Sequence, residues 1–353
     1  MKTNFLSVLI RILSLFFFTI MLCSPETTLS GASTGLLLWF QTVLPTLLPC
    51  MILADFLLRI GADRYLTKLA AKPISFLFHL SEDGCYGVLV GFLCGYPMGA
   101  KTTASLLTEH RISRREASYL LAFTNQPSSM FLIGYLCMGL FADHSTDTLI
   151  PPMVLGIYGS AILVSFIYRT GRHMNRQLLS RWATDSANVI TDTISSTQSN
   201  APKAFSPSPE KKTSHNKSAD PSPLSLLETS MMTSFEVMVK IGGYMILFSI
   251  GEAFLWKVPH VNPAVKSLLM GLVEMTTGSR HMAAGIALPW SLALCGGVTA
   301  FGGLSGFAQT ANVLKGSGLS TGHYFFWKSL QGILAAILIL LWFFLMGRYP
   351  AFS

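Results

Sequence analysis

The sequence predicts an all-α polytopic membrane protein with two inverted-topology repeats, each with a re-entrant hairpin and a broken helix, plus an N-terminal anchor helix. Composition is the first observation: 51% of the 353 residues are hydrophobic and 12% are charged, whereas soluble domains carry about 25% charged residues. The second is that apolar stretches near the roughly 20 residues that cross a bilayer recur along the chain. The third is that helix breakers and charges interrupt two such stretches, about half the chain apart.

Seven stretches have the length and composition of membrane spans. The first lacks a small-x-small cleavage site, and Leu22 stands before Cys23, so we interpret it as an uncleaved anchor, with a cleaved signal peptide as the alternative. The six cysteines show no CxxC spacing, so we expect no metal site and no cofactor. The predicted spans are residues 5–22, 35–58, 117–140, 149–168, 235–256, 289–313 and 324–346.

The basic residues give a formal net charge of +8, but they lie in short loops and do not indicate a nucleic-acid partner. Loops 59–72 and 109–116 are rich in Lys and Arg, and so is the stretch after Tyr168. Cytoplasmic loops of membrane proteins carry an excess of these residues. We therefore place the N-terminus and all the basic loops in the cytoplasm.

A Ser/Thr/Pro-rich stretch at residues 183–225 divides the membrane part into two bundles. It is too polar to bury a core, so we predict a disordered cytoplasmic linker, a plain tether rather than a regulatory segment. The expected organisation is an anchor helix and outside loop at 1–34, a first repeat at 35–168, the linker at 169–234, a second, inverted repeat at 235–347 and a tail at 348–353.

The two halves show the same order of features: an acid-apolar-base stretch, an interrupted segment and a span broken by small polar residues. If residues 85–108 and 266–288 are re-entrant hairpins, both basic loops of the first half fall in the cytoplasm and the second hairpin enters from the opposite face. Transporters built from inverted repeats bind substrate near the midplane, between broken helices. The matching stretches are DFLLR (55–59) and EAFLWK (252–257), GFLCGYPMGAK (91–101) and GLVEMTTGSR (271–280), and FTNQPSSMFLIG (123–134) and FGGLSGFAQT (301–310).

The predicted substrate site combines helix ends with two cations. Gly95, Pro97 and Gly99 allow a tight hairpin tip, and the helix that starts there attracts anions at its N-terminus. Lys101 lies in its first turn, and Arg280 occupies the matching place in the other half. Because Arg280 can take a carboxylate with two parallel hydrogen bonds, the pair suits a small dicarboxylate.

Alternative interpretations remain for these residues. Lys101 could extend to the cytoplasmic interface, and Arg280 could form a structural pair with Glu274, which could instead carry a coupling proton or Na⁺. The neutral polar groups could serve helix–helix packing. We predict no catalytic residue, no metal ligand and no enzymatic activity. The predicted substrate-binding residues are Tyr96, Pro97, Gly99, Lys101, Thr102, Asn125, Gln126, Ser128, Ser129, Thr277, Ser279, Arg280, Gly302, Gly303, Ser305 and Gln309, with Glu274 as the coupling-ion candidate.

Three motifs resemble those of the YlbJ-type sporulation integral membrane proteins of endospore-forming Firmicutes: GYPMGAK (95–101), ISRREASYLLAFTNQPSSMFLIG (112–134) and FGGLSGFAQTANVLKGSGLS (301–320). That family carries nucleoside-recognition gate domains, similar to the core of concentrative nucleoside transporters. The resemblance covers residues 35–168 and 235–346. It implies a membrane protein of the mother cell, around the forespore, that moves a small solute, with dipicolinate as the leading candidate.

Three functions therefore stay open: a secondary transporter of a small organic anion that works by alternating access, a transporter of a nucleoside or other neutral solute, and a non-transporting scaffold in spore morphogenesis. Charged groups at membrane depth are costly, which favours a transporter. The expected partners are the organic anion, the lipid bilayer and a coupling proton or Na⁺, and a homo-oligomer remains open.

Overall fold

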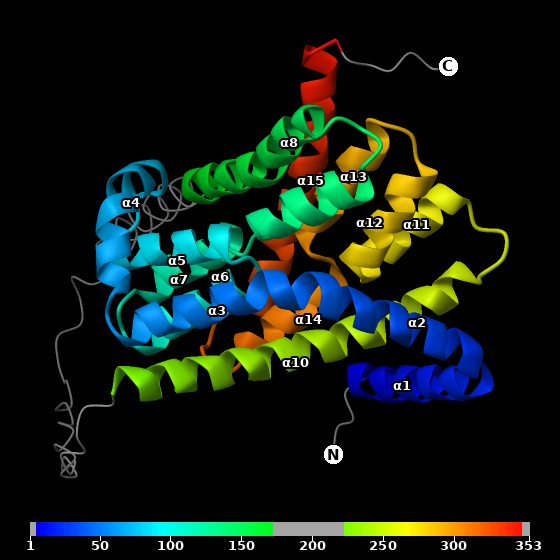
Figure 1. Ribbon diagram of the computed structural model, residues 1–353, viewed down its shortest axis with the longest axis horizontal. Helices are drawn as coiled ribbons and strands as arrows, with labels where there is room; N and C mark the ends of the chain where they lie inside the picture. The colour runs from blue at the N-terminus through cyan, green and yellow to red at the C-terminus, as the bar shows by residue number, and fades with distance from the viewer. Residues whose placement is uncertain (1–4, 172–221, 348–353) are drawn as a thin grey trace, which may run out of the picture.

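The computed structural model describes residues 5–171 and 222–347, and within these ranges the chain folds into helices without a β-strand (Figure 1). Most of the predicted linker and the predicted tail lie outside the described residues. The elements are α1 (Phe5–Cys23), α2 (Pro25–Leu38), η1 (Trp39–Val43), α3 (Leu44–Arg59), α4 (Asp63–Phe78), α5 (Glu82–Leu93), α6 (Met98–Thr108), α7 (Arg114–Phe123), η2 (Phe131–Leu140), α8 (Thr146–Val154), η3 (Leu155–Gly159), α10 (Pro223–Trp256), α11 (Pro263–Val273), α12 (Met275–Gly285), α13 (Trp290–Phe301), α14 (Gly303–Val313) and α15 (Thr321–Leu345).

Five helical stretches in the described ranges are long and apolar enough to cross a membrane, which agrees with the prediction of a polytopic α-helical membrane protein. By contrast, α5, α6, α11 and α12 have only 11 or 12 residues each. At 1.5 Å per residue they reach roughly 17–18 Å, well short of a bilayer core of about 30 Å. The five candidate spans are Pro25–Arg59, Thr146–Gly171, Pro223–Trp256, Trp290–Val313 and Thr321–Leu345.

The predicted outside loop before residue 35 is wrong, because residues 25–34 are helical and belong to a continuous stretch that ends at Arg59. Pro25 suits the first turn of a helix. The small residues that follow allow close packing: a Cβ on Gly31 would lie 2.8 Å from the Ile250 Cα, and one on Gly35 would lie 2.9 Å from the Ile246 Cα. The segment therefore packs backbone to backbone against α10, as small residues do at helix interfaces in membranes.

Helix boundaries differ from the prediction at two further places. The linker boundaries shift, because the helix of the first half continues to Gly171 and α10 already begins at Pro223. The predicted span 117–140 is broken within the stretch 123–134, as its small polar residues suggested: residues 124–128 between α7 and η2 are not helical.

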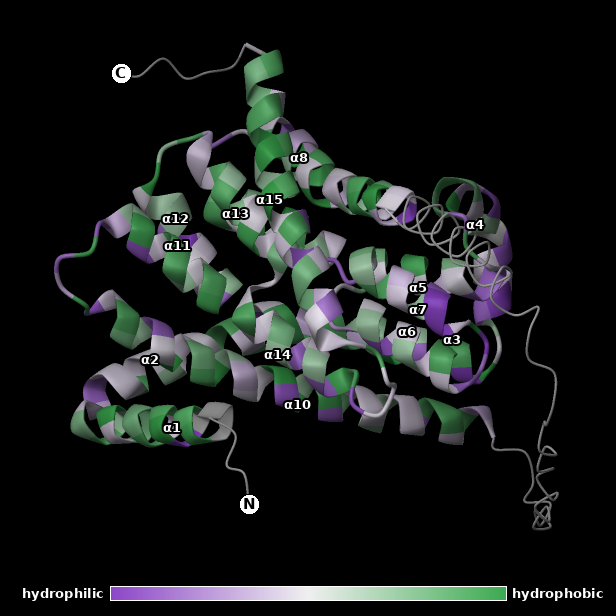
Figure 2. Ribbon diagram, turned by 180° about the vertical axis from the view of Figure 1, so that it is seen from behind, coloured by the Kyte–Doolittle hydropathy of each residue, from purple (hydrophilic) through white to green (hydrophobic). Residues whose placement is uncertain are grey.

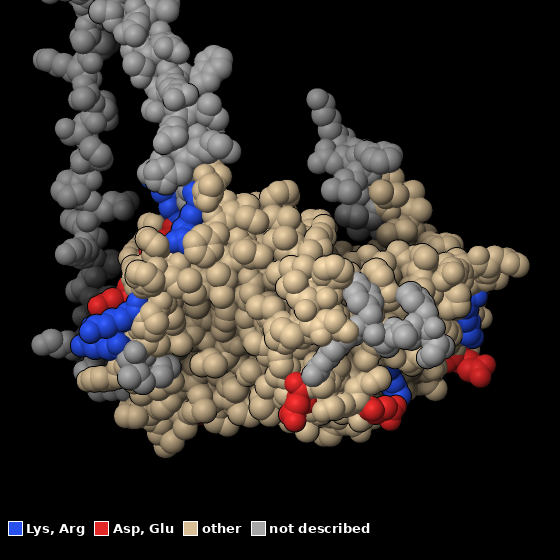
Figure 3. Space-filling model, turned by 90° about the horizontal axis from the view of Figure 1, so that it is seen from above, with Lys and Arg blue, Asp and Glu red and all other residues tan. Residues whose placement is uncertain are grey.

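The long helix α10 runs along the long axis of the molecule beside α2 and α3, whereas α15 runs across this axis (Figure 1). The helix pair α5 and α6 lies at one end of the molecule, and the pair α11 and α12 lies at the other. Hydrophobic residues cover most of α1, α8 and α15, and hydrophilic residues gather around α4 and the neighbouring end of α3 (Figure 2). Most of the face seen in Figure 3 is uncharged, and the largest group of Lys and Arg on this face lies at one end.

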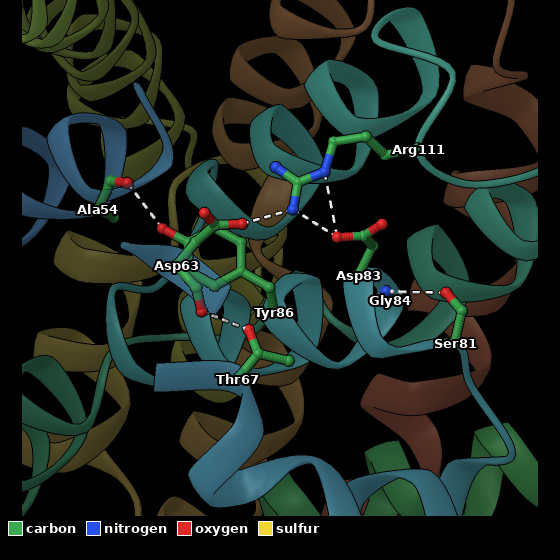
Figure 4. A network of polar contacts seen from close by, with 8 residues as sticks. All are labelled: Ala54, Asp63, Thr67, Ser81, Asp83, Gly84, Tyr86 and Arg111. Carbon is green, nitrogen blue, oxygen red and sulfur yellow. Dashed lines mark hydrogen bonds and ion pairs between the residues drawn. The ribbon is translucent and has the colours of Figure 1, made fainter. Parts of the chain in front are cut away.

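Arg111 connects three segments at this basic end (Figure 4). Its guanidinium donates to Asp63 at 2.5 Å and also to Asp83. Burial alone would lower the pKa of Arg111, but the hydrogen bonds and charges of Asp83 and Asp63 outweigh it and raise the pKa. Because Asp83 begins α5 and Arg111 follows α6, the helix pair leaves this end of the molecule and returns to it.

Candidate functional site

The first helix pair, α5 and α6, is an antiparallel hairpin that depends on glycines. A Cβ on Gly99 would come within 3.0 Å of the Gly91 Cα and within 2.7 Å of the Thr124 carbonyl oxygen. At the tip, Gly95 has φ +86, in the left-handed region that favours glycine. The predicted tip at residues 95–97 is therefore where the chain reverses direction.

The second helix pair, α11 and α12, reverses at Glu274. A Cβ on Gly278 would lie 2.2 Å from the Gly271 Cα, so the two backbones touch. The Glu274 carboxylate caps α12: Oε2 accepts hydrogen bonds from the amides of Thr276 at 2.9 Å and Thr277 at 3.0 Å. A carboxylate is well placed there, because it meets unpaired amides and the positive end of the helix dipole.

The tips of the two hairpins meet at the centre of the molecule, where the Tyr96 hydroxyl donates a hydrogen bond to the Met275 Sδ. A cavity of about 30 Å³ lies at this contact. That volume admits ordered water but is far below the roughly 300–1,000 Å³ of small-molecule sites, so an organic solute can bind there only when the hairpin tips move apart. The cavity is lined by Val43, Thr46, Leu47, Tyr96, Pro127, Ser128, Phe131, Ile241, Met245, Glu274, Met275, Thr276, Gly302, Ser305, Gly306 and Gln309.

Two helix breaks complete the cavity wall. Gly302 and Gly303 separate α13 from α14 with φ values of +93 and +67, a conformation that other residues rarely adopt. Ser305 follows in the first turn of α14 and accepts a hydrogen bond from the Gln309 side chain at 3.1 Å. In the other half, Ser128 caps η2 by accepting from the Phe131 amide at 3.2 Å.

Asn125 lies behind the cavity and ties three helices together. Its Nδ2 donates to the hydroxyls of Thr310 at 3.0 Å and Tyr324 at 2.8 Å. Its Oδ1 accepts from the Ala100 amide at 3.3 Å. The side chain is fully buried, and it therefore fixes the break after α7 against α6, α14 and α15.

Lys328 is a buried cation that the sequence reasoning missed. Only 1% of it is exposed, and its Nζ donates to the Asn125 carbonyl and to the Gln331 Oε1, both at 2.8 Å. Gln331 in turn donates to the Gln126 Oε1 at 2.7 Å. The signal was available, because Lys328 is the one charged residue of the predicted span 324–346, and such residues mark functional sites.

The structure does not bring Lys101 and Arg280 together. The Lys101 Nζ lies 3.4 Å from the Asp55 Oδ1, and Lys101 lines a separate groove with Glu236 and Lys240. Arg280 is exposed on α12. Neither residue lines the central cavity, and Glu274 caps its own helix in place of a pair with Arg280.

The other predicted residues divide into two groups. Tyr96, Ser128, Gly302, Ser305, Gln309 and the coupling candidate Glu274 line the cavity. The remaining ones do not, although Pro97, Gln126 and Gly303 lie next to lining residues in the chain, and Asn125 and Gln126 belong to the buried polar network around Lys328. The residues that do not line the cavity are Pro97, Gly99, Lys101, Thr102, Asn125, Gln126, Ser129, Thr277, Ser279, Arg280 and Gly303.

These features define a polytopic α-helical integral membrane protein with a mainly apolar and neutral polar cavity at its centre. Among curated proteins, the chain is similar to the sporulation integral membrane protein YlbJ of Bacillus subtilis (strain 168), with 26% identity over 356 aligned residues, 95% of this chain and 82% of the relative. This similarity supports membership of the YlbJ family, as the motifs predicted. No family model matches the chain, and no solved structure matches it.

Proposed function

We propose that this protein is a membrane transporter of a small organic solute and that the central cavity is its substrate site. The observation that carries the proposal is the convergence of two hairpin tips and two helix breaks on one cavity. Irregular backbone at membrane depth is tolerated where it is buried in protein or lines a watery cavity. In this proposal the hairpins are re-entrant, the halves are inverted repeats, and rocking of one half against the other opens the cavity alternately to each side.

The leading substrate class in this proposal is a small organic anion, with dipicolinate as the candidate to test first in a sporulation protein. The start of α14 lies at the cavity, with Gly302, Ser305 and Gly306 in its wall, and a helix N-terminus attracts anions. Glu274 is a carboxylate in the same wall. A dianion beside ionised Glu274 would be repelled, so this proposal requires a proton on Glu274 when substrate binds.

A neutral solute such as a nucleoside is the second candidate. It is favoured by the composition of the wall, because no Lys, Arg or His is found among the described residues that line the cavity. A neutral planar solute could use Ser128, Ser305 and Gln309 as hydrogen-bond partners and Phe131 as an apolar contact.

Uptake by proteoliposomes separates these functions. Vesicles that contain the purified protein should take up labelled dipicolinate, and unlabelled dipicolinate should compete better than uridine. Uptake of uridine with no competition by dipicolinate would assign the neutral solute instead. Uptake of neither solute, by protein whose fold is verified by a cooperative melting transition, would contradict transport of either class and favour the scaffold.

A further inference from the structure

Two buried carboxylates lie on either side of Thr277. Glu252 of α10 is 3% exposed, and Glu274 at the tip of the second hairpin is 2% exposed. The Thr277 hydroxyl lies 3.0 Å from the Glu274 Oε2 and is also hydrogen-bonded to the Glu252 Oε2. One hydroxyl has one proton and can donate to only one carboxylate at a time. The second contact therefore needs a proton on one of the acids.

The hydrogen-bond partners place this proton on Glu252. The Glu274 Oε2 already accepts from the amides of Thr276 and Thr277 and from the Thr276 hydroxyl, which stabilise its negative charge. In the described part of the chain, the Glu252 Oε1 has no hydrogen-bond partner. A buried ionised carboxylate with an unpartnered oxygen is costly, so Glu252 is the acid that donates to Thr277.

The two carboxylates face different cavities. Glu252 and Thr277 line a second cavity of about 320 Å³, whereas Glu274 lines the central one. Thr277 thus stands between the two cavities. Other titratable groups surround the pair. Glu26 of α2, Lys257 after α10 and His281 of α12 line the second cavity. On the other side, Tyr96 lies near Glu274, and the hydroxyl of Tyr135 of η2 donates to the Thr276 carbonyl.

We propose that Glu252, Thr277 and Glu274 form a proton relay between the second cavity and the substrate cavity; this proposal rests on the transport function proposed above. In the transfer, the Glu252 O–H bond breaks and its proton passes to the Thr277 Oγ1, while the original Thr277 proton passes to the Glu274 Oε2. Glu252 then takes a proton from a hydronium ion of the aqueous phase. Neutral Glu274 no longer repels an anionic substrate, so substrate and proton bind together.

The location of the proton can be tested without any transport. Purified wild-type protein at neutral pH should show the infrared C=O stretching band of a protonated carboxylic acid. Glu252→Gln should remove this band. The matched control is Glu236→Gln on the same helix, because Glu236 is exposed and paired with Lys240 at 2.5 Å; it should leave the band unchanged. A band that survives in Glu252→Gln, or is absent from the wild type, would overturn the proposal.

Coupling is tested in proteoliposomes by comparing accumulation of dipicolinate under an imposed pH gradient with its exchange at equal pH. Glu252→Gln and Thr277→Val should lower accumulation at least tenfold more than they lower exchange, and Thr277→Ser should restore accumulation because it keeps the hydroxyl. Wild-type exchange without any accumulation under the pH gradient, or full accumulation by Thr277→Val, would refute the relay and leave transport standing. Absence of exchange in the wild type would refute transport, and the infrared band would still decide where the proton lies.

Discussion

Gly278 offers a direct test of the second hairpin, because its backbone touches the neighbouring arm. In Gly278→Ala, the new Cβ would lie 2.2 Å from both the Cα and the amide nitrogen of Gly271. Carbon atoms pack at about 3.5–4.0 Å, so α11 and α12 would have to separate by roughly 1.3 Å or more. Overpacking of this kind costs about 1–3 kcal/mol. The hairpin tip, with Glu274 and Met275, would move with it.

The assay is the thermal unfolding of the purified protein in detergent, followed by tryptophan fluorescence. The matched control is Gly285→Ala on the same helix, where the new Cβ meets no atom within 4 Å. Alanine is favoured over glycine in a helix by up to about 1 kcal/mol, so this control should be neutral or slightly stabilising. Equal melting temperatures for the two variants would refute the close contact of the hairpin arms.

Three further predictions concern the basic end, the buried lysine and the cavity. Arg111→Met should lower the free energy of unfolding by about 3 kcal/mol, since it leaves a buried carboxylate unpaired, and denaturant unfolding measures this loss. Lys328→Met leaves the buried Asn125 carbonyl without its donor and the Gln331 Oε1 with Gln126 as its remaining donor, so it should lower the melting temperature in detergent; an unchanged value would contradict the buried contacts. Gln309→Leu removes one neutral hydrogen-bonding group from the cavity and should raise the half-saturating dipicolinate concentration in uptake assays by roughly 2- to 12-fold. Lys101 and Arg280 lie outside the cavity, so Lys101→Gln and Arg280→Gln should raise the half-saturating dipicolinate concentration less than Gln309→Leu does. A larger increase would support the predicted binding of substrate by these two cations.

The hairpins could be predicted because their cause is local. Gly95 and Glu274 interrupt apolar segments. Because a helix ends near each of these residues and neighbouring helices enclose the segment, the chain has to bend or reverse direction there. The same holds for the break at Gly302, where the positive φ needs a glycine. The ion pair of Glu236 and Lys240 on α10 is also local, because the two residues lie four positions apart on one face of the helix.

The face that each side chain presents could not be predicted in this way. The position of Lys101 in the first turn of α6 follows from the sequence, but its contact with Asp55 depends on how the hairpin packs against α3. Likewise, the contact between Lys328 and the Asn125 carbonyl joins residues 203 positions apart. The small polar residues at the start of α2 suggest a loop when the sequence is taken alone. They form a helix in the structure because their small side chains allow close packing against α10, which is distant in the sequence.

The contacts of Asn125 have a consequence for how the protein is made. Three of its four side-chain and carbonyl partners, Thr310, Tyr324 and Lys328, belong to the C-terminal third of the chain, and the glycines of α2 pack against α10 in the same way. During synthesis the first bundle must therefore stay in the bilayer with its amide groups and its glycine face uncovered until the second bundle emerges from the ribosome. Assembly of the central cavity is consequently a late event, and the first half made alone should be a target for membrane proteases and chaperones.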